Sequence, residues 1–159
     1  MVGSLTDTIT GKGTFESYCP LNKYSGGKMT KVYLGGTCNK SIWRDIVIQG
    51  LKIDYYNPMV PDRTSRNEEE EVRQRMECDL ILYVITPKMA GFYSIAELVD
   101  DSNKRPKDTY FCYLIRDEQD TFSNDQIYSL QSIAKLVRSN GVTICYSLEN
   151  CTWALNDRR

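Results

Sequence analysis

Leu80-Ile81-Leu82-Tyr83-Val84-Ile85 is the most apolar run of the chain, and Asp79 opens it. A short run without polar alternation is typical of a parallel strand that is buried on both faces of its sheet. We therefore predict a central strand over residues 79–85.

Shorter β-rich segments flank this strand and alternate with segments of helical spacing. Strands are predicted over residues 31–34, 52–56, 109–115 and 142–146. Helices are predicted over residues 41–51, 94–101 and 125–139, and another begins at Glu68. This alternation predicts an α/β fold with a doubly wound, flavodoxin-like or Rossmann-like parallel sheet of five strands in the order 2-1-3-4-5. Residues 147–159 are expected to pack across the sheet through Trp153 and Leu155.

The length and composition predict one soluble domain after a flexible arm. The 159 residues suit a single core. Residues 1–28 are rich in Thr, Ser and Gly and lack apolar periodicity, so we expect a flexible N-terminal extension followed by a domain over residues 29–159.

Charge and hydropathy exclude several classes of partner. Lys and Arg number 20 against 21 Asp and Glu, for a net charge of −1, so a nucleic-acid polymer is not expected as a partner. The first residues lack a basic flank followed by an apolar core, and no apolar stretch approaches the roughly 20 residues that a membrane helix needs, so we expect neither a secretion signal nor a membrane span. We expect a cytoplasmic protein that does not bind membranes.

The residue types present also limit the chemistry. The absence of histidine excludes nucleophilic schemes in which a histidine activates serine or cysteine. The six cysteines contain no CxxC pair, which favours reduced, mostly buried thiols over a metal site or a disulfide framework. No metal and no cofactor are expected.

The predicted topology points to two loops. Ligands of such sheets bind at the carboxyl ends of the strands, where the strand order reverses. Here these loops are Gly35–Asn39 and Thr86–Ser94. Gly35 and Gly36 would let a ligand approach the backbone, and Thr37 and Asn39 would supply hydrogen bonds. A tight turn without a ligand is the alternative.

Two carboxylates near these loops suit cleavage of a glycosidic bond. Asp79 opens the central strand, and Glu97 lies early in the next helix, where we expect it to be partly buried. One carboxylate attacks or shields the anomeric carbon while another manages the proton of the leaving base. The alternative makes Glu97 a surface residue. The glutamates over residues 68–71 are expected to form a solvated face.

Four segments together resemble one enzyme family. They are Lys31-Val32-Tyr33-Leu34-Gly35-Gly36-Thr37, Cys78-Asp79-Leu80-Ile81-Leu82-Tyr83-Val84-Ile85-Thr86-Pro87, Gly91-Phe92-Tyr93-Ser94-Ile95-Ala96-Glu97-Leu98 and Asp100-Asp101-Ser102-Asn103-Lys104-Arg105-Pro106. This combination resembles the nucleoside 2-deoxyribosyltransferase family, in a subgroup common in bacteria and bacteriophages. The similarity runs from about Lys31 to Val142.

The resemblance implies roles for individual residues. Glu97 would be the nucleophile, Asp79 would bind the sugar or base, and Tyr33 would position the nucleophile. Gly91 and Ser94 would contribute to the substrate site. The family often has another aspartate shortly before the nucleophile, whereas residues 88–92 here contain no acid.

The resemblance also implies an assembly. Sites of the family are completed by a polar residue of a neighbouring subunit, a role that Asn124 or Asp125 would fill. We therefore expect a homo-oligomer that acts on a small nucleoside or nucleotide.

The expected function is cleavage or transfer at the N-glycosidic bond of a (deoxy)nucleoside or nucleotide, through a covalent glycosyl-enzyme intermediate. Transfer and hydrolysis differ only in which acceptor enters second. One alternative is a non-catalytic binder of a nucleotide or an ADP-ribose-like ligand. Another is a flavodoxin-like electron carrier that holds a flavin phosphate at residues 35–39.

Overall fold

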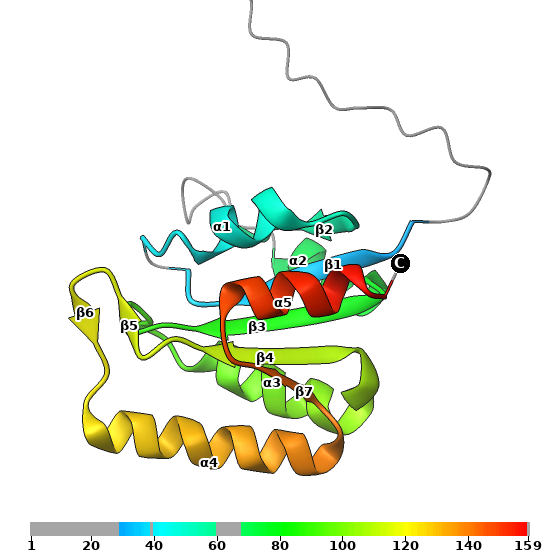
Figure 1. Ribbon diagram of the computed structural model, residues 1–159. Coiled ribbons are helices and arrows are strands. Elements are labelled where there is room, and N and C mark those ends of the chain that lie inside the picture. The colour runs from blue at the N-terminus through cyan, green and yellow to red at the C-terminus, as the bar shows by residue number, and fades with distance from the viewer. Residues whose placement is uncertain (1–28, 39, 60–67, 159) are drawn as a thin grey trace, which may run out of the picture.

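The computed structural model describes residues 29–38, 40–59 and 68–158, which form a parallel sheet with helices on both faces (Figure 1). The predicted arm over residues 1–28 lies outside this range. The five-stranded sheet has the order β2-β1-β3-β4-β7, which confirms the predicted 2-1-3-4-5 topology. Its strands are β1 (Lys31–Gly36), β2 (Asp54–Tyr56), β3 (Leu80–Ile85), β4 (Thr109–Tyr113) and β7 (Thr143–Cys145).

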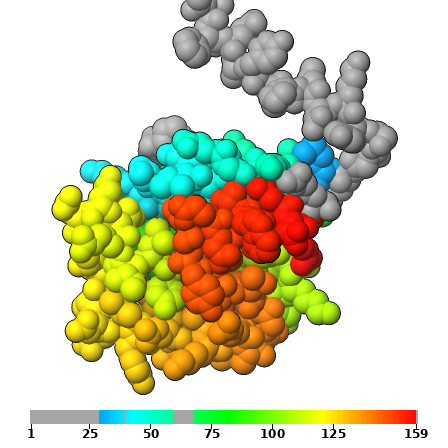
Figure 2. Space-filling model, in the orientation of Figure 1, coloured from blue at the N-terminus to red at the C-terminus, as the bar shows by residue number. Residues whose placement is uncertain are grey.

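The helices divide between the two faces of the sheet. Helices α1 (Trp43–Gly50) and α5 (Leu148–Asn156) pack on one face, where Val47 and Leu155 are completely buried. Figure 2 shows α5 in red lying across this face. Helices α2 (Glu68–Glu77), α3 (Tyr93–Lys104) and α4 (Asn124–Asn140) lie on the other face, where Leu98 and Val137 are completely buried.

Strand β3 joins the two cores. All six of its residues are buried, as predicted. Leu82 and Val84 belong to the core under α1 and α5, whereas Ile81 and Tyr83 belong to the core under α3 and α4. Side chains alternate between the faces of a strand, so one apolar run supplies both cores.

Helix α4 has the ends that its sequence predicts. Ser123 and Gln126 form a capping box at its start. Gly141 ends the helix in the left-handed region with φ of 110°, a conformation that glycine adopts without strain.

Two segments differ from the prediction. The strand expected to reach Ile115 ends at Tyr113 and is followed by a hairpin of β5 (Arg116–Asp117) and β6 (Asp120–Thr121). The final segment is the helix α5, in which Leu155 is buried but Trp153 is 69% exposed. The expectation that Trp153 packs on the sheet was therefore wrong.

The described residues carry no helix long and apolar enough to cross a membrane. Five cysteines lie in the described part of the chain, and all five are free thiols.

Candidate functional site

The turn after β1 contains two glycines that the packing of the sheet requires. Gly36 has φ of +116°, and a Cβ there would lie 2.0 Å from the carbonyl oxygen of Val84. A Cβ on Gly35 would lie 2.7 Å from the ring of Tyr83. The close approach that we expected of a ligand is therefore made by β3 itself.

Thr37 is held by hydrogen bonds within the protein. Its amide donates to the carbonyl of Val84 at 2.9 Å, and its hydroxyl accepts from the amide of Thr86 at 2.9 Å. Its carbonyl accepts from Trp43 Nε1 at 2.9 Å and from Arg44 Nη1 at 2.6 Å. These contacts make the turn a structural junction between β1, β3 and α1.

Arg44 is a buried cation at this junction, and the sequence reading missed it. Its side chain is 3% exposed and donates from Nε and Nη2 to the carbonyl of Leu34 at 3.1 and 3.0 Å. Burial lowers the pKa of its guanidinium. A cation in the first turn of a helix interacts unfavourably with the helix dipole. The position of Arg44 in the sequence could therefore have indicated that its side chain binds elsewhere in the protein.

The β5–β6 hairpin reaches the loops that follow β1 and β3. Lys88 forms an ion pair with Glu118 and lies 3.7 Å from Asp117. Ser41, just before α1, donates to Asp117 Oδ2 at 2.5 Å. An open hollow of about 570 Å³ is lined by Lys40, Pro87, Lys88 and Asp120. The hairpin thus covers part of this edge.

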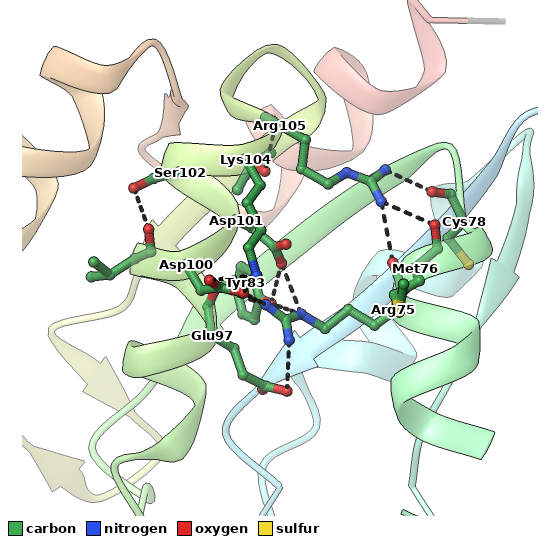
Figure 3. Close-up of polar contacts among 12 residues, drawn as sticks. Arg75, Met76, Cys78, Tyr83, Glu97, Asp100, Asp101, Ser102, Lys104 and Arg105 are labelled. Atoms are coloured by element: carbon green, nitrogen blue, oxygen red, sulfur yellow. Dashed lines mark hydrogen bonds and ion pairs between the residues drawn. The ribbon is translucent and has the colours of Figure 1, made fainter. Parts of the chain in front are cut away.

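Arg75 of α2 connects to three carboxylates of α3 (Figure 3). Its Nε lies 2.9 Å from Asp101 Oδ2, its Nη2 lies 3.1 Å from Asp100 Oδ2, and its Nη1 lies 3.7 Å from Glu97 Oε1. We call Arg75, Tyr83, Glu97, Asp100 and Asp101 the Arg75 cluster. It fixes α2 against α3 beside the sheet.

Tyr83 ties the Arg75 cluster to β3. Its hydroxyl donates to Asp101 Oδ2 at 2.7 Å and accepts from Arg75 Nε at 3.0 Å. Burial, followed by the negative charge of Asp101, raises the pKa of its phenol. Tyr83 therefore acts as a neutral hydrogen-bonding partner in this cluster.

Glu97 has the partial burial that we predicted. Its side chain is 14% exposed, and its partner Arg75 is 13% exposed. The ion pair favours the charged form of the carboxylate. Glu97 is thus a nearly enclosed carboxylate, which suits attack on carbon better than a solvated one.

The structure brings Tyr33 close to Glu97. Tyr33 is 4% exposed and stacks on Tyr56 with ring centroids 5.7 Å apart. Burial and then the charges of Glu97 and Glu71 raise the pKa of its phenol. Every enclosed side-chain nitrogen or oxygen of the described residues has a hydrogen-bond partner. No hydrogen bond of the Tyr33 hydroxyl to those residues is seen, so this hydroxyl is not completely enclosed.

Glu71 is the acidic residue that the sequence reading missed. The expected solvated face holds for Glu68 and Glu69, but Glu71 is only 9% exposed. The apolar side chains of Val72 and Met76 on the same helix are 48% and 75% exposed. Helix α2 therefore turns charged groups toward the sheet, which a hydrophobic pattern cannot reveal.

Asp79 does not join this group. It precedes β3 at the amino end of the strands, and its Oδ2 accepts from the amide of Lys31 at 3.0 Å. Arg105, which follows α3, donates to the carbonyl of Asp79 at 2.9 Å. Glu97 precedes Arg105 by eight residues, which corresponds to about 12 Å along α3. The sequence placed Asp79 near the ligand edge, and the structure puts its backbone at the opposite edge.

The other expected binding residues are dispersed. Gly91 is exposed, and a Cβ there would have no neighbour within 4 Å. Ser94 Oγ donates to the carbonyl of Gly36 at 3.4 Å. Asn124 and Asp125 are exposed at the start of α4. Asn39 lies outside the described residues.

Comparisons with protein-family models, curated proteins and solved structures found no match to the chain.

Proposed function

We propose that the protein cleaves or transfers at the N-glycosidic bond of a (deoxy)nucleoside or nucleotide, with Glu97 as the nucleophile. One observation carries the proposal: a carboxylate that is 14% exposed lies near enough to the buried Tyr33 for its charge to raise the pKa of that phenol. The resemblance of residues 31–37 and 91–98 to the nucleoside 2-deoxyribosyltransferase family supports the same assignment.

The chemistry is a double displacement. An oxygen of Glu97 attacks the anomeric carbon, and the C–N bond breaks with its electron pair left on the base, which takes up a proton. The resulting ester is opened when water or a second base attacks the same carbon and the carboxylate of Glu97 leaves. Water gives hydrolysis, and a second base gives transfer.

Two neighbours suit this role of Glu97. Arg75, 3.7 Å away, favours the ionised carboxylate that a nucleophile must provide. Tyr33 stays protonated because burial and the two nearby glutamates raise the pKa of its phenol. Its hydroxyl can therefore donate a hydrogen bond that orients Glu97 or the sugar.

A non-catalytic binder of a nucleotide or an ADP-ribose-like ligand is the second candidate. Residues 88–92 contain no acid, and the ion pair with Arg75 stabilises the negative charge of Glu97, which makes the carboxylate a weaker nucleophile. Both observations fit a site that holds a ligand without cleaving it.

Incubation with a panel of nucleosides and their 5′-phosphates, scored by chromatography for free base, tests the proposal. Glu97→Gln keeps the shape of the side chain but removes the nucleophile, so base release should fall by at least about 1000-fold. Glu69→Gln, at an exposed position on α2, is the matched control and should cleave like the wild type.

Three outcomes discriminate between the candidates. A wild type that releases base, paired with an inactive Glu97→Gln, supports the proposal. Equal rates in both would remove Glu97 from the mechanism. A wild type that releases no base from the panel but binds a nucleotide, with affinity retained in Glu97→Gln, would establish the binder instead.

A further inference from the structure

Three cysteines meet in the core between the sheet and α5. Cys112 of β4 and Cys145 of β7 are direct partners across the two parallel strands, so their side chains lie on the same face of the sheet. Cys151 lies on the buried face of α5, which packs on these strands (Figure 1). All three belong to one core, and none is more than 2% exposed. We call these three residues the thiol cluster.

Cys151 is in hydrogen-bonding contact with both strand cysteines. Hydrogen bonds with Cys112 and Cys145, together with burial, raise the pKa of the Cys151 thiol, so Cys151 keeps its proton. The hydrogen bond with Cys151 lowers the pKa of the Cys145 thiol. The pair therefore offers a sulfur that is stabilised as a thiolate, Cys145, beside a protonated thiol, Cys151.

The position of Cys145 also gives an oxidant a route to the thiol cluster. Cys145 is the last residue of β7, which is an edge strand of the sheet. The next residue, Tyr146, is 73% exposed. The ends of edge elements open at a smaller free-energy cost than central strands do. A small, uncharged oxidant can therefore reach Cys145 without unfolding of the domain.

We propose that the thiol cluster is a redox switch, in which a hydroperoxide converts the thiols of Cys145 and Cys151 into a disulfide. The resting state is the reduced one, in which all five cysteines of the described residues are free. The proposal stands apart from the glycosidic chemistry, because α5 and Cys145 lie in the core opposite to the one that contains Tyr33.

The oxidation takes two steps with hydrogen peroxide as the oxidant. The Cys145 thiolate attacks one oxygen of the peroxide, the O–O bond breaks, and the departing hydroxide takes up the proton that Cys145 lost. The sulfur of Cys151 then attacks the sulfenic acid of Cys145, the S–O bond breaks, and hydroxide leaves as water with the proton of Cys151. Two thiols lose two electrons in total, and one peroxide becomes two molecules of water.

The disulfide would fix α5 to the edge of the sheet. Cys151 lies in the first turn of α5, where its amide donates to the carbonyl of Ser147 at 3.0 Å. The far end of α5 contacts the end of α1, because Asn156 Nδ2 donates to the carbonyl of Gly50 at 2.9 Å. Oxidation should therefore restrict local opening of α5 and of the end of α1 that it contacts.

The test uses the full chain with two of its six cysteines replaced. Cys38→Ser removes an exposed thiol, and Cys19→Ser removes the cysteine outside the described residues, so that neither can link two chains. The protein is treated with hydrogen peroxide, denatured, blocked with N-ethylmaleimide and digested with trypsin. Cys145 and Cys151 then lie in one peptide over residues 139–158, whereas Cys112 lies in another over residues 108–116.

The expected product has a distinct mass. The peptide over residues 139–158 should lose two hydrogens, about 2 Da, and take up no N-ethylmaleimide. Dithiothreitol should restore both reactive thiols. Hydrogen exchange of the α5 amides should be slower in the oxidised protein than in the reduced protein, because the bond restricts local opening.

Two variants provide the controls, and circular dichroism checks that each is folded. Cys78→Ser removes another thiol that is 2% exposed but belongs to the opposite core, and it should oxidise like the parent protein. Cys151→Ser removes the partner of Cys145, so dimedone should trap a sulfenic acid at Cys145.

Four results would overturn the proposal. They are an unchanged peptide over residues 139–158 after peroxide treatment, a cross-link of this peptide to residues 108–116, a disulfide that forms equally fast in urea-unfolded chains, and hydrogen exchange of α5 that oxidation leaves unchanged. The mapping of the parent protein decides the first two without any substitution in the thiol cluster.

Discussion

Arg75 Nε lies 2.9 Å from Asp101 Oδ2 and joins α2 to α3. The side chain of Asp101 is 6% exposed, and it also accepts a hydrogen bond from the hydroxyl of Tyr83 at 2.7 Å. Arg75 also lies 3.7 Å from Glu97 and 3.1 Å from Asp100, so one cation serves three carboxylates of α3.

Removal of the cation should destabilise the fold. Arg75→Leu leaves a buried carboxylate without its counter-charge, and we expect a loss of about 3 kcal/mol in the free energy of unfolding. Urea titration followed by circular dichroism measures it. Arg73→Leu on the same helix is the control, because Arg73 is 54% exposed and should matter far less. Equal losses in both variants would contradict a special role for Arg75.

Gly36 should tolerate no side chain. Gly36→Ala places a Cβ 2.0 Å from the carbonyl oxygen of Val84 at φ of +116°. Strain and overpacking together should cost about 3 kcal/mol or more. Gly91→Ala meets nothing within 4 Å and should change stability by at most about 0.5 kcal/mol. Thermal melts of the two variants compare them, and a Gly36→Ala protein that melts like the wild type would refute the packing account.

Stability should fall in alkali through two buried phenols. The folded protein raises the pKa of Tyr33 and Tyr83 above the ordinary value of about 10. The unfolded chain therefore loses these protons first, so the stabilisation is complete below about pH 10 and declines as pH rises further. Each phenol should contribute a slope of roughly 1.4 kcal/mol per pH unit. Tyr33→Phe or Tyr83→Phe should each make the decline less steep between pH 10 and 11; unchanged slopes would show that these phenols ionise freely.

The protein should form a homo-oligomer. Phe92 and Tyr93 at the start of α3 are 78% and 66% exposed, and aromatic residues are enriched in interfaces. Light scattering should give a multiple of the 18.3 kDa chain mass. Phe92→Ser should lower this mass, whereas Trp153→Ser on α5 should leave it unchanged. A mass of 18.3 kDa for the wild type at micromolar concentration would show a monomer and contradict this prediction.

The sequence predicted the sheet because its strands are apolar runs with distinct ends. Residues 80–85 are apolar on both faces of a strand, so the middle of the sheet is where all of these side chains are buried. The β5–β6 hairpin was missed because its two-residue strands carry Arg116, Asp117 and Asp120 and offer no apolar alternation.

The site was predicted only in part, because burial of charge follows from tertiary packing. Glu97 lies on an amphipathic helix between Ala96 and Leu98, so its partial burial could be predicted from these adjacent apolar residues. Glu71 stands among four consecutive glutamates, and only its burial in the folded chain shows that it is the one facing inward. Asp79 was assigned to the ligand edge, although the first residue of a parallel strand lies at the opposite edge.

The two tryptophans of the chain provide built-in optical probes of different regions. Trp43 is 1% exposed and donates from its indole to the turn after β1, whereas Trp153 is 69% exposed on α5. Iodide quenches only those tryptophans that solvent can reach. It should therefore quench the fluorescence of Trp153 and leave the fluorescence of Trp43 unchanged. The remaining fluorescence would then follow the junction of β1, β3 and α1 without any added label.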